Sequence, residues 1–177
     1  MDNKIGKIIH SVSIRNLSFY LKIVLLAAML PTLAPSFLAA DEVMQLTSDG
    51  VIEITGNDKM QYDIAMFEVK AGQEVTIILK NIGKLPKVAM AHNVVVMKMG
   101  TDAMKFVMAG ISSKDTDYIP PAMKNSVIAK TDLAGPGETV KVTFTAPSEP
   151  GKYPFLCTFP GHFFAGMKGL MIVKADS

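Results

Sequence analysis

The sequence contains one cysteine, Cys157, in 177 residues. A single thiol excludes a disulfide within the chain, so this thiol must be buried, paired with another chain or bound to another group. Histidine is almost as rare, because only His10, His92 and His162 are present. A function that needs many histidine side chains, such as a site with several metal ions, is therefore disfavoured.

Charge is unevenly placed near the N-terminus. Residues 1–22 carry four basic side chains and one acidic side chain, and residues 23–40 carry none. A basic segment followed by an apolar one is typical of a signal peptide, and Ala39, Ala40 and Asp41 favour cleavage after Ala40. The 18 uncharged residues also approach the roughly 20 that span a bilayer, so an uncleaved membrane anchor is the alternative. In both cases we expect residues 41–177 to form an exported, periplasmic domain; in the second, residues 23–40 keep it at the membrane.

A strongly basic surface is missing once residues 1–40 are set aside. The remaining chain has 14 basic and 15 acidic side chains and no run of lysines. Nucleic acids bind proteins mainly through clustered positive charge, so we exclude nucleic-acid binding.

Short apolar segments separated by turn residues make up most of residues 41–177. Val140, Val142 and Phe144 alternate with polar residues, which is the pattern of a strand with one buried face. Residues 93–97 form an almost continuous apolar run, which indicates a strand buried on both faces. The spacing predicts an all-β sandwich or barrel of about eight strands, including residues 51–55, 62–69, 74–80, 93–97, 153–157 and 170–173.

One segment has a helical pattern instead. Thr101 is suited to cap a short helix in which Met104, Val107 and Met108 fall at helical spacing. We therefore expect a helical flap within residues 101–121.

The segment "CTFPGHFFAGM" contains the single cysteine and two further residues that bind metals. Cys157, His162 and Met167 follow one another at steps of five, and Pro160 and Gly161 predict a turn between the first two. The loop is flanked by two predicted strands, so these side chains can meet at one pole of the sandwich. His92, just before another strand, can reach the same pole.

These four residues carry the chemistry of a particular metal site. A thiolate, two imidazoles and a distant thioether form a trigonal site with a weak axial ligand, as in blue copper electron-transfer centres. Taken singly, each residue is explained as well by core packing. Zinc is the competing metal, but a catalytic zinc site needs an activated water, whereas this loop supplies phenylalanines.

Four segments resemble azurins and auracyanins, which are small blue copper proteins of the cupredoxin family. "CTFPGH" (residues 157–162) stands as it does in azurins, and "GNDKMQYD" (56–63), "LPKVAMAHN" (85–93) and "KDTDYI" (114–119) are similar to azurin segments in the same order. The resemblance covers about residues 51–174. It implies a cupredoxin-like Greek-key β-sandwich for residues 41–177, with one type 1 copper held by His92, Cys157 and His162 as equatorial ligands and Met167 as axial ligand.

The resemblance also identifies differences from azurins and one supporting residue. Asn93 matches an azurin asparagine that joins the two ligand loops by hydrogen bonds. Ala91 stands where azurins have glycine, which alters the approach of its carbonyl to the metal. Four residues separate His162 from Met167, as in auracyanin, where azurins have three. The azurin disulfide is absent.

The function implied is transfer of single electrons between redox partners, without enzymatic activity. An oxidase or reductase would need a second copper site with further histidines, and residues 41–177 have only His92 and His162. Copper storage or delivery is the alternative, favoured by thirteen methionines including Met97 and Met99, although core packing explains this pair equally well. We expect cytochromes or membrane electron-transfer complexes to dock at an apolar patch around His162, formed by Leu85, Met90, Phe159, Pro160, Phe163 and Phe164.

Overall fold

The chain is described by a computed structural model, in which residues 44–46 and 49–175 are placed. The predicted signal peptide or anchor, residues 1–40, lies outside the described residues. Among the residues that are described, no helix is both long and apolar enough to cross a bilayer.

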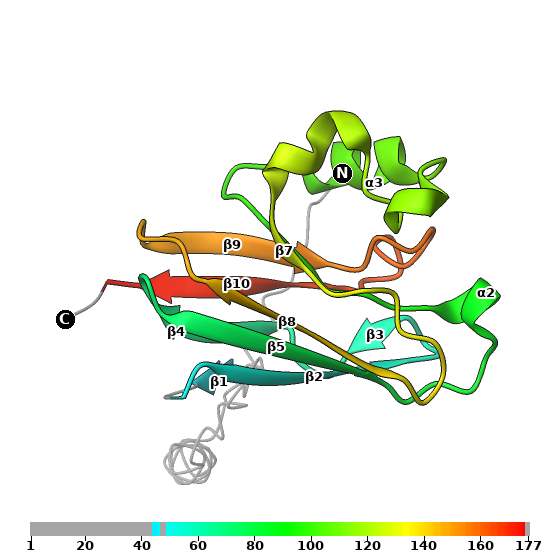
Figure 1. The fold of residues 1–177 in the computed structure, drawn as a ribbon, viewed down its shortest axis with the longest axis horizontal. Coiled ribbons are helices and arrows are strands. Elements are labelled where there is room, and N and C mark those ends of the chain that lie inside the picture. Colours follow the sequence, from blue (N-terminus) through cyan, green and yellow to red (C-terminus); the bar gives the residue numbers. More distant parts are fainter. Residues whose placement is uncertain (1–43, 47–48, 176–177) are drawn as a thin grey trace, which may run out of the picture. The chain divides into compact units, whose positions relative to one another are not determined.

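Two β-sheets pack face to face, as expected for a sandwich (Figure 1). The six-stranded sheet contains, in spatial order, β1 (Met44–Leu46), β4 (Met66–Lys70), β10 (Lys168–Lys174), β9 (Gly151–Leu156), β6 (Val95–Met97) and β7 (Val127–Lys130). The four-stranded sheet contains β3 (Gln61–Tyr62), β2 (Val51–Asn57), β5 (Glu74–Asn81) and β8 (Thr139–Thr145). The all-β prediction is confirmed, while β1 and β7 were not predicted. The predicted strand 62–69 is divided into the end of β3 and most of β4, which belong to different sheets.

Alternation along the strands builds the core between the sheets. Every second residue of β2 and β5 is buried, and β8 alternates half-buried with exposed residues, as predicted from its sequence. The buried side chains of these strands pack against those of the other sheet and form one core cluster. Its largest members include Ile52, Ile54, Ile77, Leu79, Phe67, Phe155 and Met171. Each such side chain contributes about 1.5–3 kcal/mol through burial.

The helical flap covers the outer face of the six-stranded sheet (Figure 1). It contains α3 (Ala103–Gly110), η3 (Lys114–Thr116) and η4 (Pro121–Ser126). Phe106, Val107 and Ile119 of the flap pack on Val95, Met97 and Leu156 of the sheet. Strand β6 is therefore buried on both faces, as its apolar sequence predicted.

Two details of the predicted flap were wrong. The N-cap of α3 is Asp102, whose carboxylate accepts a hydrogen bond from the Lys105 amide at 3.0 Å, and not Thr101. Met104 and Met108 are 58% and 54% exposed, so they lie on the solvent side. Phe106 takes the buried side instead, because its ring fills the space above β6 and β9.

One pole of the sandwich gathers the loops that carry the predicted ligands. The loop between β9 and β10 lies there, next to the short helix α2 (Lys87–Met90), which precedes His92 (Figure 1). Strand order places β9 between β10 and β6, so the segment that begins with His92 runs beside the segment that ends in Cys157.

Candidate metal centre

Three of the four predicted ligands form one buried cluster. Nδ1 of His92 lies 3.2 Å from Nδ1 of His162, and Sγ of Cys157 lies 3.5 Å from the same His162 nitrogen. One donor atom from each residue lies within 4.8 Å of the other two. None of the three residues is more than 1% exposed. Within the described part of the chain, no carboxylate joins this cluster.

Met167, the fourth predicted ligand, is fully buried beside this cluster. A Cβ atom built on Gly56 would lie 3.0 Å from Cε of Met167 and 3.0 Å from Cδ2 of His92. The thioether side chain and the His92 ring therefore share one small space, which Gly56 of strand β2 leaves open.

The loop between β9 and β10 is closed by its own backbone hydrogen bonds. The amide of His162 donates to the Phe159 carbonyl at 3.1 Å, and the amide of Met167 donates to the His162 carbonyl at 3.0 Å. The amide of Cys157 donates to the Met167 carbonyl at 3.1 Å. Gly161 has a φ of 89°, which residues with a side chain rarely adopt. The predicted turn after Cys157 is thus confirmed, and it returns the loop to its starting point.

The backbone of His92 is fixed from the opposite side. Its amide donates to the Ala134 carbonyl at 3.0 Å, and the Ala134 amide donates to the His92 carbonyl at 2.7 Å. The side-chain amide of Asn81 donates to the carbonyls of Met90 and Ala134 at 3.3 and 3.0 Å. His92 is therefore held between the end of α2 and the segment that precedes β8.

Asn93 joins the two ligand segments, as expected from the resemblance. Its Oδ1 accepts a hydrogen bond from the Thr158 amide at 2.9 Å, and its Nδ2 donates to Thr158 Oγ1 at 2.8 Å. The Thr158 hydroxyl donates to the Asp117 carbonyl at 2.6 Å, and the Tyr62 hydroxyl donates to the Asn93 carbonyl. Asn93 and Thr158 are both buried, so these bonds fix the residues that follow His92 and Cys157.

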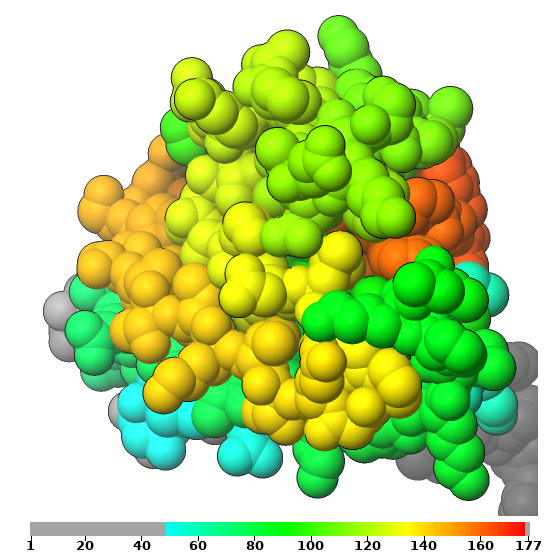
Figure 2. Space-filling model, turned by 45° about the vertical axis from the view of Figure 1, so that its right-hand side comes forward, coloured from blue at the N-terminus to red at the C-terminus, as the bar shows by residue number. Residues whose placement is uncertain are grey.

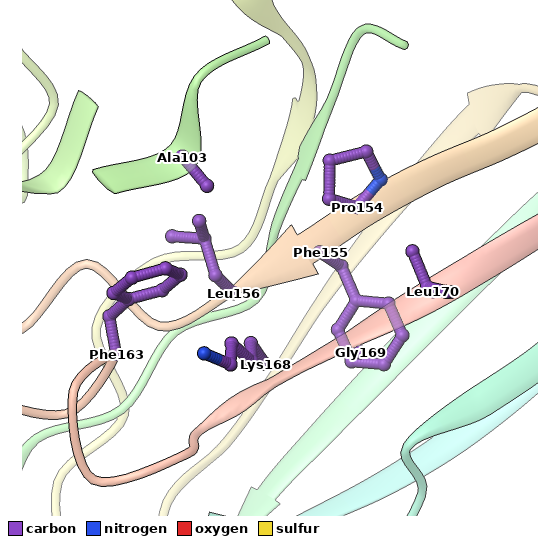
Figure 3. A pocket seen from close by; sticks show the side chains of 8 residues that line it. All are labelled: Ala103, Pro154, Phe155, Leu156, Phe163, Lys168, Gly169 and Leu170. Carbon is purple, nitrogen blue, oxygen red and sulfur yellow. The ribbon is translucent and has the colours of Figure 1, made fainter. Parts of the chain in front are cut away.

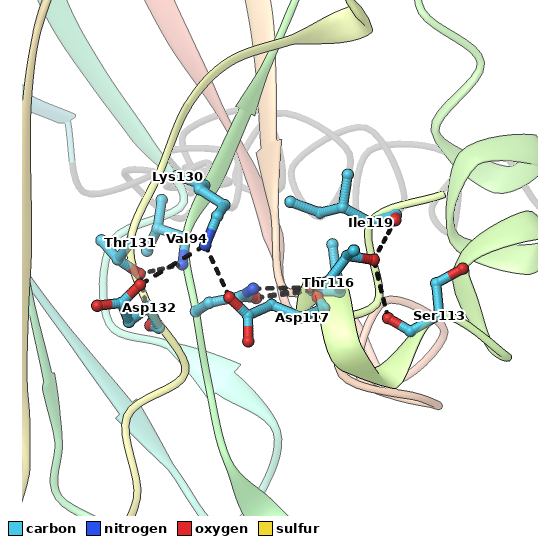
Figure 4. Close-up of polar contacts among 10 residues, drawn as sticks. Val94, Ser113, Thr116, Asp117, Ile119, Lys130, Thr131 and Asp132 are labelled. Atoms are coloured by element: carbon cyan, nitrogen blue, oxygen red, sulfur yellow. Dashed lines mark hydrogen bonds and ion pairs between the residues drawn. The ribbon is translucent and has the colours of Figure 1, made fainter. Parts of the chain in front are cut away.

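The flap is tied to the same region through Asp117 (Figure 4). The Asp117 carboxylate accepts from Lys130 Nζ of β7 at 2.7 Å, and Lys130 also lies 3.6 Å from Asp132. Thr131, the residue after Lys130, accepts a hydrogen bond at Oγ1 from the Val94 amide at 3.0 Å. Asp117 is therefore held at its carboxylate by β7 and at its carbonyl by the ligand loop.

A stack of rings covers the cluster on one side. The ring of His162 lies between those of His92 and Phe159, with centroid distances of 4.9 and 4.8 Å. Tyr118 packs edge-on against Phe159 at 5.3 Å. The apolar rings keep water from the imidazole of His162.

Burial shifts the pKa values of the metal-free cluster toward its neutral forms. It raises the pKa of the Cys157 thiol to about 12. Burial, and secondarily the neighbouring His92, lowers the pKa of His162 to about 4. Burial also lowers the pKa of His92, although Asp58 acts in the opposite direction. At neutral pH both imidazoles are ready to bind a metal, and only the thiol must lose a proton.

This donor set fits copper better than a hard cation. Two neutral imidazoles and a thiol converge in a buried space without a carboxylate among the described residues, and soft sulfur with imidazole is the ligand set of type 1 copper. Such a set offers Ca²⁺ or Mg²⁺ no oxygen ligands.

Several supporting residues were not found from the sequence. Gly56 falls just after the predicted strand 51–55, but it lies inside strand β2 and borders the ligands. Thr158 and Asp117 act through contacts between segments far apart in the chain. Only the position of Thr158 directly after Cys157 could have pointed to its role.

Known proteins with similar sequences belong to one family of copper-binding proteins. Residues 49–174 match the family model of copper binding proteins, plastocyanin/azurin family. An azurin from Alcaligenes faecalis is 45% identical over 127 residues, which cover 67% of this chain and 93% of that protein. Auracyanin-A from Chloroflexus aurantiacus is 38% identical over 118 residues, which cover 66% of this chain and 69% of that protein.

Solved structures show the same fold. A dithionite-reduced auracyanin from the photosynthetic bacterium Roseiflexus castenholzii superimposes with a TM-score of 0.64 at 38% identity, over 72% of this chain and 99% of that one. Auracyanin B superimposes with a TM-score of 0.61 at 29% identity, over 70% and 88% of the two chains.

Proposed function

Because the chain belongs to the plastocyanin/azurin family of copper-binding proteins, we propose that His92, Cys157, His162 and Met167 are its copper ligands. The protein is a small blue copper protein that carries single electrons between redox partners, and it holds one type 1 copper. The observation that carries this conclusion is the buried cluster of two imidazoles and one thiol within 4.8 Å.

The chain's own residues prepare this site for fast electron exchange. Bound copper supplies the one-electron couple. Asn93 and Thr158 hold the two ligand segments together, and the ring of Phe159 covers His162. Since the ligands are buried and fixed, little has to move when the charge of the site changes, so reorganisation is small.

Electron carriers of this kind need no substrate pocket at the metal. We therefore assign the protein the role of a carrier and not of an enzyme. This assignment is supported by the small number of histidines. Besides His10, the sequence has only His92 and His162, and both lie in this cluster.

Redox partners are proposed to dock at the apolar patch around His162. Leu85 and Phe164 are 45% and 56% exposed, and Pro160 is exposed as well. Val88 on α2, which was not among the residues predicted for this patch, is 86% exposed. Phe163 is half-buried and lines a cavity of about 310 Å³ beside β9 and β10 (Figure 3). It contributes more to packing the loop than to the docking surface.

Periplasmic location remains part of the proposal. It is supported by the basic and then apolar N-terminal residues 1–40. The choice between a cleaved signal peptide and a membrane anchor formed by residues 23–40 concerns a part of the chain outside the described residues. Mass spectrometry of the mature protein in a membrane and a soluble fraction distinguishes the two.

Copper storage or delivery is the second candidate function. Delivery requires an exposed, exchangeable site, whereas this cluster is buried. Met97 and Met99, which favoured copper storage in the sequence, also do not form a pair of exposed ligands. Met97 lies in the core, whereas Met99 follows β6 and is 43% exposed. The two residues do not form one surface.

The proposed ligands are tested by copper titration of the purified protein with metal analysis and a visible spectrum. We expect one copper per chain and an intense thiolate-to-copper absorption band. Cys157→Ser should lose this band and keep the β-sheet circular dichroism, because a hydroxyl does not replace the thiolate. A band that persists in Cys157→Ser would exclude the assigned thiolate, and bound copper without any such band in the unmodified protein would favour storage.

A further inference from the structure

A small pocket opens on the copper-site pole beside the ring stack. It has a volume of about 180 Å³ and is lined by Lys87, Val88, Ala91, Lys114, Tyr118, Leu133 and Phe159. Figure 2 shows the segments that form it meeting on one face: the yellow-green flap, the green segment with α2, the yellow segment near residue 133 and the orange ligand loop. The pocket is smaller than the roughly 300–1,000 Å³ of small-molecule sites, so it suits a single side chain.

The wall of this pocket touches the metal cluster. Phe159 separates the pocket from the ring of His162, whose centroid lies 4.8 Å away. Ala91, another lining residue, directly precedes His92. A partner group in this pocket therefore lies one ring away from a proposed copper ligand.

The rim of the pocket is positive over apolar walls. Lys114 is exposed and has no ion-pair partner in the described part of the chain. Lys87 pairs with Glu138 at 2.7 Å, but both side chains are about half exposed, at 50% and 49%. Exposed pairs of this kind contribute little to stability, so the Lys87 ammonium group can also bond to an incoming carboxylate. Two lysines line the pocket together with Val88, Leu133 and the two rings, and this combination matches a carboxylate carried on an apolar stem.

The pocket is preformed. Asp117 and Tyr118 are consecutive non-glycine residues with positive φ, at 54° and 61°. Such a conformation persists only where the surroundings impose it. Lys130 holds the Asp117 carboxylate and Thr158 holds its carbonyl, so Tyr118 presents its ring at a fixed place against Phe159.

We propose that this pocket receives an acidic side chain of a protein redox partner, and that the lysine rim selects partners with carboxylates around their own redox centre. The inference rests on the proposed function and adds the chemical class of the partner. It also extends the contact beyond the apolar patch: Lys114, Tyr118 and Leu133 lie outside that patch, whereas Val88 and Phe159 belong to both.

The test measures electron transfer from the reduced, copper-loaded protein to two c-type cytochromes, one with carboxylates and one with lysines around the exposed haem edge. One electron passes from the copper to the haem iron, so haem absorption reports the bimolecular rate constant. The variants are Lys114→Gln, Lys114→Glu and Lys114→Arg. Lys152→Gln is the matched control, because Lys152 is exposed at the opposite end of β9 from Cys157.

We expect the rate with the acidic cytochrome to fall about threefold in Lys114→Gln and about tenfold in Lys114→Glu at low salt. Lys114→Arg should restore it, and the differences should vanish at high salt, where exposed charges are screened. The basic cytochrome should react no more slowly with these variants than with the unmodified protein. Copper absorption, reduction potential and the apo-protein melting temperature should be the same in all of them.

Two outcomes overturn the inference while leaving the proposed function intact. One is a normal copper spectrum with equal effects of Lys114→Gln and Lys152→Gln on the acidic cytochrome. The other comes from using hexacyanoferrate(III) as the electron acceptor in place of a cytochrome. If Lys114→Gln slows electron transfer to this small anion only, the pocket is a site for small anions and not for a protein partner. Absence of copper colour or of any electron transfer in the unmodified protein would instead refute the proposed function.

Discussion

Gly56 sets the closest approach of strand β2 to the proposed ligands. A Cβ there would lie 3.0 Å from both His92 and Met167, which is closer than nonbonded carbon atoms normally pack. We predict that Gly56→Ala displaces one or both side chains, weakens copper binding about tenfold or more, and changes the copper absorption and electron paramagnetic resonance spectra. Thr55→Ala, at the neighbouring position of the same strand, should leave these spectra unchanged. Identical copper affinity in Gly56→Ala would show that the ligands have room to spare.

Met167 is predicted to tune the copper and not to be required for its binding. A weak axial thioether stabilises Cu(II) relative to Cu(I), so Met167→Leu should keep its copper and raise the reduction potential. A rise of about 60 mV corresponds to a tenfold weaker relative binding of Cu(II). Cyclic voltammetry measures the change, with Met104→Leu on the exposed side of α3 as the control. An unchanged potential would mean that Met167 is not a ligand.

Among single residues, the sequence predicts those that belong to a rare residue type and lie close together in the chain. Cys157, His162 and Met167 could be predicted because one turn brings them together, and His92 because it is the only other histidine after residue 40. Gly56 could not, since its role depends on how closely β2 passes the ligands. The same holds for the contact between Thr158 and Asp117, which are 41 residues apart.

Two loops and the flap are joined by hydrogen bonds that act between elements. Asn93 bonds both the amide and the hydroxyl of Thr158, and all of these groups are buried. Asn93→Ala leaves the Thr158 amide without its partner, which costs about 1–3 kcal/mol for a buried donor. We predict a lower melting temperature of the apo-protein and faster loss of copper to a chelator.

Asn125→Ala provides the control for this change, because Asn125 is exposed on η4. It should alter neither the melting temperature nor the rate of copper loss. If Asn93→Ala behaved in the same way, the connection between the loops would not support the site.

Element boundaries were predicted where one face of a strand is buried. Strands β2, β5 and β8 alternate regularly and were found within about two residues. Helix α3 was placed correctly, but its buried face was not. Its apolar residues include Met104, Phe106, Val107 and Met108, which surround the helix, so helical period alone does not select a face. Only the space over β6 and β9 decides in favour of Phe106.

At the level of the whole molecule, the sandwich acts as a frame for one pole. Strand β9 ends at Leu156, β10 begins at Lys168, and β6 lies beside β9. The proposed ligands lie at the ends of these strands, while the core between the sheets holds the strands in register. Since the single cysteine is in the cluster, no disulfide within the chain contributes to this frame.

Copper affinity of the whole protein should depend on pH through one proton. In the metal-free chain, burial raises the pKa of Cys157 to about 12, so the thiol is protonated at all moderate pH values and must release its proton when copper binds. The pKa of His162 is lowered to about 4, so this imidazole is already neutral above about pH 5. The pKa of His92 is also lowered from its usual value by burial, so both imidazoles are neutral above about pH 7. We predict that the dissociation constant of copper rises about tenfold for each pH unit that the solution is lowered between pH 9 and 7, and more steeply at lower pH, where the imidazoles take up protons.

Competition with a chelator of known pH dependence measures this slope. Cys157→Ser should remove most of this pH dependence between pH 9 and 7, because the proton that copper displaces is then absent. A slope near zero in the unmodified protein would mean that the thiolate exists before copper arrives. A change of about a hundredfold per pH unit above pH 7 would mean that a histidine is still protonated there, and that burial at this pole is too weak to keep both imidazoles neutral.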